Sequence, residues 1–116
     1  MTAVSDRYRE CFLFVDADDR AGVLDALARR YGVTPVRRRL DLSAAELHVV
    51  GGDKPTPGGP DTFVQWGTKI EFEATTMPDG EVVGFVAGLM GFLRSRGHRV
   101  VAACDFEDEL PQLDLA

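Results

Sequence analysis

The pattern of apolar positions in the first third of the chain predicts a strand followed by a helix. Cys11 to Val15 is an unbroken apolar run, too short for a helix and rich in strand-forming side chains, so a buried strand is expected over 10–16. The acidic segment 16–19 then supplies a helix N-cap and favourable negative charge. Apolar residues recur at helical spacing up to Tyr31, and Gly32 is expected to end the helix.

The middle of the chain predicts two further strands joined by a loop. Residues 36–50 read as extended chain with an irregularity at 43–45. The segment 51–61 is so rich in glycine and proline that it predicts a flexible loop. From 62 to 74 apolar and charged residues alternate, which predicts a strand with one buried and one solvated face and a bulge at Gly67.

A second helix and a fourth strand complete the predicted elements. The helix is expected to follow the segment 78–80 and to continue to Arg96, where Gly97 closes it. Residues 99–106 then predict a strand, and its acidic continuation is stopped by Pro111. The C-terminal tail is expected to span 110–116.

These elements follow in the order β-α-β-β-α-β, which is that of the ferredoxin-like fold. We therefore expect a single α+β domain over 1–116, with a four-stranded antiparallel sheet in the spatial order 4-1-3-2 and two helices on one face. The first strand is then central, as its apolar composition requires. Since the first and last strands become antiparallel neighbours, Cys11 and Cys104 are expected to lie close together as buried, inert thiols.

The second predicted helix has a bare outer face. It carries no charge from Val82 to Leu93, and its apolar stripe is expected to face the sheet. The opposite face bears Gly84, Gly88 and Gly91, and a glycine in a helix costs about 0.8–1 kcal/mol relative to alanine. Three explanations stay open. In the first, the tail or the loop covers this face. In the second, another backbone docks on it in a homodimer or a partner complex. In the third, the glycines arose by neutral drift and have no role.

The charge of the chain is unevenly placed and narrows the range of partners. Residues 1–58 carry nine basic and nine acidic side chains, whereas residues 59–116 carry four basic and ten acidic ones, for a net charge of -6. An acidic field repels nucleic acid and anionic membranes, so neither is expected as a partner, and a basic protein is favoured. With no leader-like or membrane-spanning segment in the sequence, we expect a cytoplasmic protein.

Two charged clusters are candidate contact residues. The acidic one is a solvated rim on an edge strand or an electrostatic docking edge for a basic protein, and it comprises Asp105, Glu107, Asp108 and Glu109. The basic one, Arg37 to Arg39, is placed on the other edge strand. There it either guards the edge against aggregation or binds phosphate or carboxylate.

No residue pattern points to catalysis, a metal or a cofactor. The aspartates of 16–19 are explained by helix capping as well as by a cation site. His48 and His98 have no cysteine, serine or aspartate partner at a recognisable spacing, and the glycine-rich loop lacks the ending of a phosphate-binding loop. We therefore expect no enzyme activity and no cofactor.

The end of the chain resembles a known group of proteins. The run from Val100 to Pro111 is similar to the C-terminal ending of small uncharacterised actinobacterial proteins, some of which look like toxin-immunity proteins. The likeness covers 63–111 and brings no catalytic residues with it. It implies an inhibitor that masks a toxin by surface complementarity, a role that suits an acidic surface when the toxin is a basic nuclease.

Two hypotheses of function follow. The leading one is a non-catalytic protein-binding domain, with an immunity-type protein as its more specific form, which uses the acidic 105–109 edge and the glycine face. The alternative is a homodimeric small-molecule sensor or carrier, because two sheets of this kind can pair and enclose a pocket. Trp66, Phe72 and His48 are the side chains expected to line that pocket.

Overall fold

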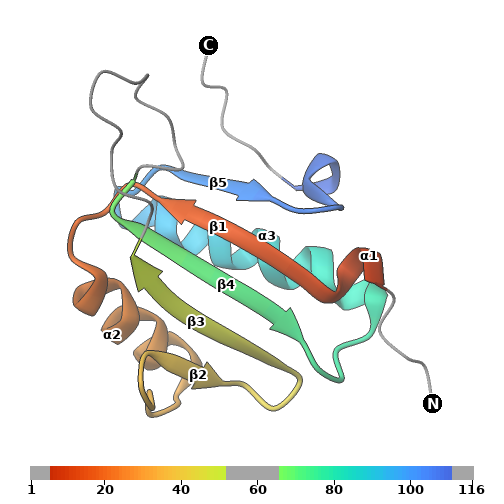
Figure 1. Ribbon diagram of the computed structural model, residues 1–116, viewed down its shortest axis with the longest axis horizontal. Coiled ribbons are helices and arrows are strands. Elements are labelled where there is room, and N and C mark those ends of the chain that lie inside the picture. The colour runs from red at the N-terminus through yellow and green to blue at the C-terminus, as the bar shows by residue number, and fades with distance from the viewer. Residues whose placement is uncertain (1–5, 52–65, 111–116) are drawn as a thin grey trace.

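A sheet flanked by helices makes up the structure, a computed structural model that describes residues 6–51 and 66–110 (Figure 1). Its elements are α1 (Asp6–Arg9), β1 (Glu10–Val15), α2 (Arg20–Tyr31), β2 (Arg39–Asp41), β3 (Ala45–Gly51), β4 (Thr68–Ala74), α3 (Asp79–Ser95), β5 (Val100–Ala103) and the 3₁₀ turn η2 (Glu107–Glu109).

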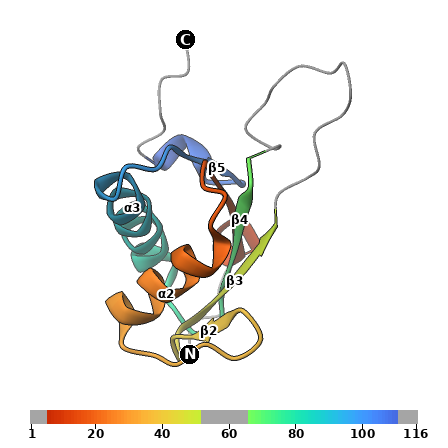
Figure 2. The ribbon, with the colours of Figure 1, turned by 90° about the vertical axis from the view of Figure 1, so that its left-hand side faces the viewer.

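The sheet is antiparallel throughout, with the strand order β2-β3-β4-β1-β5. Both α2 and α3 pack on the same face of it (Figure 2). The predicted α+β class is confirmed, and the four longer strands, β5-β1-β4-β3, stand in the predicted order with β1 inside the sheet. The prediction of four strands and two helices is corrected, because the described residues form five strands and three α-helices.

The additional strand comes from the segment predicted as extended over 36–50. This segment folds back on itself at the predicted irregularity, where Ser43 has a φ of 70°. The Asp41 carboxylate accepts a hydrogen bond of 2.9 Å from the backbone N–H of Ser43 and stabilises the turn. The result is a hairpin of β2 and β3 in place of one strand.

The last strand ends earlier than its sequence predicts. β5 stops at Ala103, and the chain turns where the N–H of Glu107 donates to the carbonyl of Cys104 at 3.1 Å. Phe106 lies in this turn and is fully buried, so it anchors the segment to the core just before η2. The prediction of an acidic edge strand over 105–109 was therefore wrong.

Local signals placed both long helices correctly. The Asp19 carboxylate caps α2 by accepting from the N–H of Gly22 at 2.9 Å, and Gly32 ends it in the left-handed conformation. The core lies between the sheet and these helices. Its largest fully buried side chains are Phe72, Phe106, Leu13, Leu27, Leu40, Leu47, Ile70, Leu89, Met90, Leu93, Val15 and Val49.

The predicted proximity of Cys11 and Cys104 is confirmed. Phe12 pairs with Ala103, so the antiparallel register continues with Cys11 opposite Cys104. The Cys11 thiol hydrogen-bonds to Cys104, which lowers the pKa of Cys104, and the same contact together with burial raises the pKa of Cys11 far above its usual range. Both cysteines are free thiols.

Candidate functional site

The face of the sheet turned away from the helices is the most distinctive surface of the described residues. Strand side chains alternate between two faces, and those beside the buried positions point outward. We call this outward side the open face. Its exposed part carries three kinds of side chain, namely acidic residues at one end of the strands, a paired charge network, and the half-exposed Phe12, which has 38% of its surface accessible.

Four carboxylates form one cross-strand row on the open face. Glu10 pairs with Glu73, Glu73 with Glu46, and Glu46 with Asp41. We call this set the acidic row. Like charges directly opposite each other in a sheet are destabilising. Within the described residues no lysine, arginine or histidine lies within 4.0 Å of any of these carboxylates, so the row stands without a counter-charge.

The neighbouring charges on the same face are, by contrast, paired with one another. Glu71 lies 3.3 Å from His48 Nδ1 and 3.5 Å from Lys69 Nζ. Lys69 also sits over the ring of Phe12, 5.2 Å from its centroid. The excess negative charge of the open face is therefore concentrated at its acidic row.

A surface hollow of about 400 Å³ adjoins the acidic row at the start of β1. It brings Glu10 and Phe12 of the open face together with Asp105 of the predicted acidic cluster. Its lining consists of Asp6, Arg9, Glu10, Cys11, Phe12, Ala103, Cys104 and Asp105. The only cation among these, Arg9, already approaches Asp6 at 3.9 Å, so the hollow favours a positively charged occupant.

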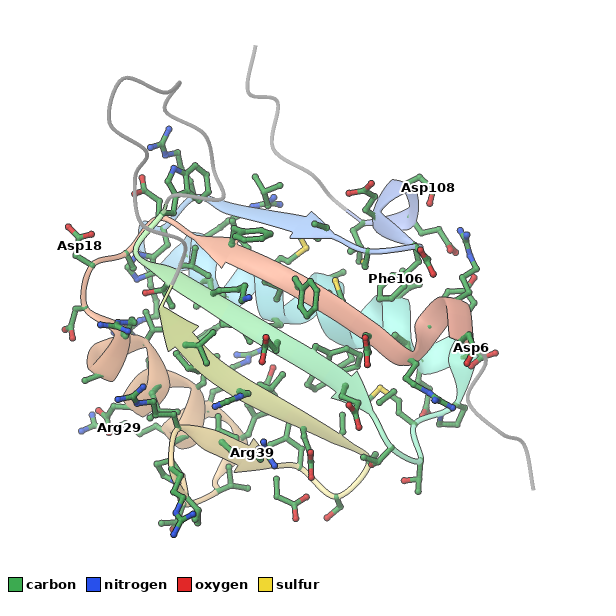
Figure 3. The ribbon with its side chains drawn as sticks, viewed as in Figure 1. Asp6, Asp18, Arg29, Arg39, Phe106 and Asp108 are labelled. Atoms are coloured by element: carbon green, nitrogen blue, oxygen red, sulfur yellow. The ribbon has the colours of Figure 1, made fainter. Side chains whose placement is uncertain are left out.

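Two members of the acidic cluster singled out from the sequence, Asp108 and Glu109, are paired with other side chains of the protein at its surface. Arg7 contacts Asp108 at 3.3 Å and Glu109 at 3.0 Å, and the Tyr8 hydroxyl donates to Glu109 at 2.9 Å. Figure 3 shows Asp6 and Asp108 at the same end of the molecule, where α1 meets η2. Asp108 and Glu109 thus hold α1 in place, while Asp105 and Glu107 stay exposed.

The glycine face of α3 is as bare as its sequence predicts. Gly84, Gly88 and Gly91 are exposed, and no described atom lies within 4 Å of where a Cβ would stand on any of them. The buried stripe on the other side of the helix is Val82, Val86, Leu89, Met90 and Leu93, which faces the sheet as expected. Most of the tail and loop proposed to cover the glycines, 111–116 and 52–61, lies outside the described residues.

The three residues predicted to line a ligand pocket do not share a surface. Phe72 is 1% exposed and points into the core, where its ring lies 5.6 Å from that of Phe85. His48 is on the open face, on the opposite side of the sheet. Trp66 precedes β4 and stacks with Arg99 at 4.8 Å. The alternation of strand positions separates Phe72 from His48.

Two of the three aspartates considered for a cation, Asp16 and Asp19, bond to other groups of the protein. Asp19 caps α2, and Asp16 accepts two hydrogen bonds from Arg99, at 2.8 and 2.6 Å. In the part of the chain that the structure describes, no three histidine, cysteine, aspartate or glutamate side chains gather closely enough to hold a metal ion. Nor is any helix in those ranges long and apolar enough to span a membrane.

The sequence concealed the acidic row because its members are far apart along the chain. Glu71 and Glu73 were correctly expected on a solvated face. Bringing Glu10, Glu46 and Asp41 beside them requires the register of three strand pairs, which is a long-range property. Comparison of the chain with models of protein families, with curated proteins and with solved structures finds no match.

Proposed function

We propose that this protein is a non-catalytic protein-binding domain that receives a basic partner on its open face. The observation that carries the proposal is the acidic row, four aligned carboxylates without a counter-charge in the described residues. A surface that destabilises the free protein is retained more readily if a partner relieves the repulsion. Lysine and arginine side chains of a partner would do this directly.

The hollow beside the row gives this surface an anchor point. Binding energy in protein complexes concentrates at a few side chains that fill pockets, and arginine is prominent among them. Asp6, Glu10 and Asp105 supply acceptors for such a side chain, and the exposed ring of Phe12 supplies an apolar contact beside them. The combination fits an arginine or lysine from the partner better than a small neutral ligand.

The immunity-type hypothesis proposes that the partner is a basic toxin, and the acidic row is compatible with such a partner. A basic toxin would meet the acidic row and be held by charge complementarity, which speeds association and selects partners. The sheet order supports treating the domain as a variant of the ferredoxin-like fold with an added edge strand. The docking residues proposed are then Glu10, Asp41, Glu46 and Glu73 with Asp105, in place of Asp108 and Glu109.

The sensor hypothesis has less support. Its pocket requires Trp66, Phe72 and His48 to converge, whereas Phe72 is buried in the core and His48 lies on the opposite side of the sheet. A homodimer in which two open faces stack with the acidic rows at the same end would also bring the two rows together. The like charges would then repel each other. The basic partner remains the better proposal.

The proposal is tested by affinity capture with a matched charge control. The full chain is immobilised, incubated with host lysate at low salt, and compared with Glu46→Gln/Glu73→Gln and with Asp18→Asn/Glu107→Gln. Both variants remove the same charge, but only the first changes the open face. Captured proteins are identified by mass spectrometry, and the candidate is purified for calorimetry.

The expected result is a basic protein whose binding is weakened at least tenfold by the open-face variant and is little changed by the control. Ultracentrifugation of the chain alone reports on self-association. Equal loss in both variants, or recovery of the chain with nothing but itself, would contradict the proposal.

A further inference from the structure

The side chains of four arginines make no ion pair, hydrogen bond or aromatic contact within the residues that the structure describes. Every other lysine and arginine of the described residues contacts a carboxylate, a backbone carbonyl or an aromatic ring. The exceptions lie at the start of α2 and along the approach to β2, and they are Arg20, Arg37, Arg38 and Arg39. Figure 3 shows Arg39 on β2, at the opposite edge of the sheet from Asp108. Two of them, Arg20 and Arg38, border one hollow, where their guanidinium groups can hold an anion between them.

Two of these arginines occupy a backbone conformation that arginine disfavours. The N–H of Val36 donates to the carbonyl of Arg39 at 2.9 Å, and the N–H of Arg39 donates back at 3.0 Å. The two residues between them, Arg37 and Arg38, have φ values of 53° and 67°. Such a turn normally carries Asn-Gly, because a Cβ is strained at positive φ. Arginine at these two positions destabilises the turn, so a role of the side chain other than stability is expected.

Arg20 is also unfavourably placed for stability alone. It is the first residue of α2, where the helix dipole is positive and a cation is disfavoured. The capping Asp19 carboxylate is bonded to the N–H of Gly22. The guanidinium lies against Gly51, where an added Cβ would be only 2.6 Å from Arg20 Nη1. Glycine at the end of β3 therefore leaves room for this side chain.

Arg20 and Arg38 border a single hollow of about 220 Å³. The rest of its lining is apolar and consists of Ala21, Leu24 and Val49. We propose that this hollow binds a small organic oxyanion, a phosphate or carboxylate attached to a short apolar body. Arg20 and Arg38 hold the oxyanion, the N-terminus of α2 adds favourable field, and the apolar side chains contact the body.

This site is separate from the proposed protein-binding surface. Val49 and Gly51 lie at the end of β3, whereas Glu46 of the acidic row lies near its start. The strand therefore carries the basic hollow at one end and the acidic row at the other. Failure of one proposal leaves the other standing.

A titration followed by nuclear magnetic resonance tests the site with three defined probes. The full chain receives phenyl phosphate, benzoate or inorganic phosphate at low salt, and the amide signals of Ala21, Leu24 and Val49 are followed. Saturable shifts at these residues are expected with at least one organic probe, and with an affinity several-fold above that of inorganic phosphate. The stronger organic probe identifies the preferred oxyanion. Non-saturable shifts, or equal affinity for all three probes, would overturn the proposal.

Two turn variants separate binding from backbone strain. Arg38→Gly removes a gripping side chain and is expected to weaken the organic probe about tenfold or more, the loss typical of a charge-assisted hydrogen bond. The same change raises the melting temperature, because glycine suits the positive φ. Arg37→Asn relieves strain at the adjacent position, raises the melting temperature and leaves affinity unchanged. Arg20→Gln weakens the probe without affecting the turn. Wild-type affinity in Arg38→Gly and Arg20→Gln, or equal loss in Arg37→Asn, would contradict the site.

Discussion

The two acidic regions of this molecule differ in what neutralises them. Asp108 and Glu109 are adjacent in sequence and conspicuous there, yet Arg7 and Tyr8, about a hundred residues away, engage both. The acidic row is scattered along the chain and becomes visible only through strand register, and it has no counter-charge in the described residues. Density of charge in a sequence is therefore a poor guide to which carboxylates lack a counter-charge in the folded protein.

The two acidic regions also have opposite effects on the stability of the fold. The 105–109 segment closes the fold, because it carries the buried Phe106 and ties down α1. The acidic row opposes folding through like-charge repulsion. Removing side chains should thus destabilise the protein in the first region and stabilise it in the second.

The largest effect is expected at the anchor of the 105–109 segment. Phe106→Ala should lower the free energy of unfolding by about 3–5 kcal/mol, since it empties a fully buried site beside the Tyr8 ring, 5.4 Å away. Urea denaturation measures it. Phe12→Ala, on the open face, is the control and should cost about 1 kcal/mol. Equal losses in the two variants would show that the segment is not anchored.

A second effect concerns the glycine face of α3, for which the sequence left three explanations open. Replacing Gly84, Gly88 and Gly91 together by alanine should raise the free energy of unfolding by about 2–3 kcal/mol, because each site is helical and open. Gly97→Ala is the control and should destabilise, since its φ is 92°. If the triple variant gains nothing in thermal unfolding, the face is occupied and belongs with the binding surfaces.

A smaller effect tests the hydrogen bond from the Tyr8 hydroxyl to Glu109. Tyr8→Phe keeps the ring on Phe106 and removes the hydroxyl that donates to Glu109, so unfolding should become easier by about 1 kcal/mol. The same substitution in a Glu109→Ala background should have almost no further effect. Additive losses in this double-mutant cycle would mean that the two side chains act independently.

The smallest effect tests the acidic row itself. Glu73 stands between Glu10 and Glu46, so Glu73→Gln should stabilise the protein by about 0.5 kcal/mol at low salt. The neighbouring Glu71→Gln should not stabilise it, because it breaks the pairs with Lys69 and His48. At 1 M salt the gain from Glu73→Gln should disappear in chemical denaturation. A loss of stability at Glu73 would remove the contrast between the two acidic regions.

Features set by local physics were predictable from the sequence. Asp19 and Gly32 mark the ends of α2 through their own capping chemistry, and the buried run of β1 identifies an inner strand. Sheet order and the meeting of Cys11 with Cys104 followed from these elements.

Features set by distant contacts were not predictable in the same way. The segment after β5 is held by the packing of Phe106 against Tyr8, a residue near the start of the chain. The acidic row depends on the registers of three strand pairs. The tight turn at Arg37 and Arg38 was not predicted for a different reason. Its residues contradict the usual chemistry of a tight turn, and such a conflict between local preference and structure is common at functional positions.

The position of β1 inside the sheet has a consequence for how the protein is made. Its partners β4 and β5 are synthesised more than fifty residues later, so β1 has no neighbour while the first half of the chain leaves the ribosome. Its backbone hydrogen bonds cannot form until β4 and β5 have also emerged. Folding therefore waits for nearly the whole chain and proceeds through long-range pairing, which is slow. During that interval the nascent chain is open to chaperones and to misassembly.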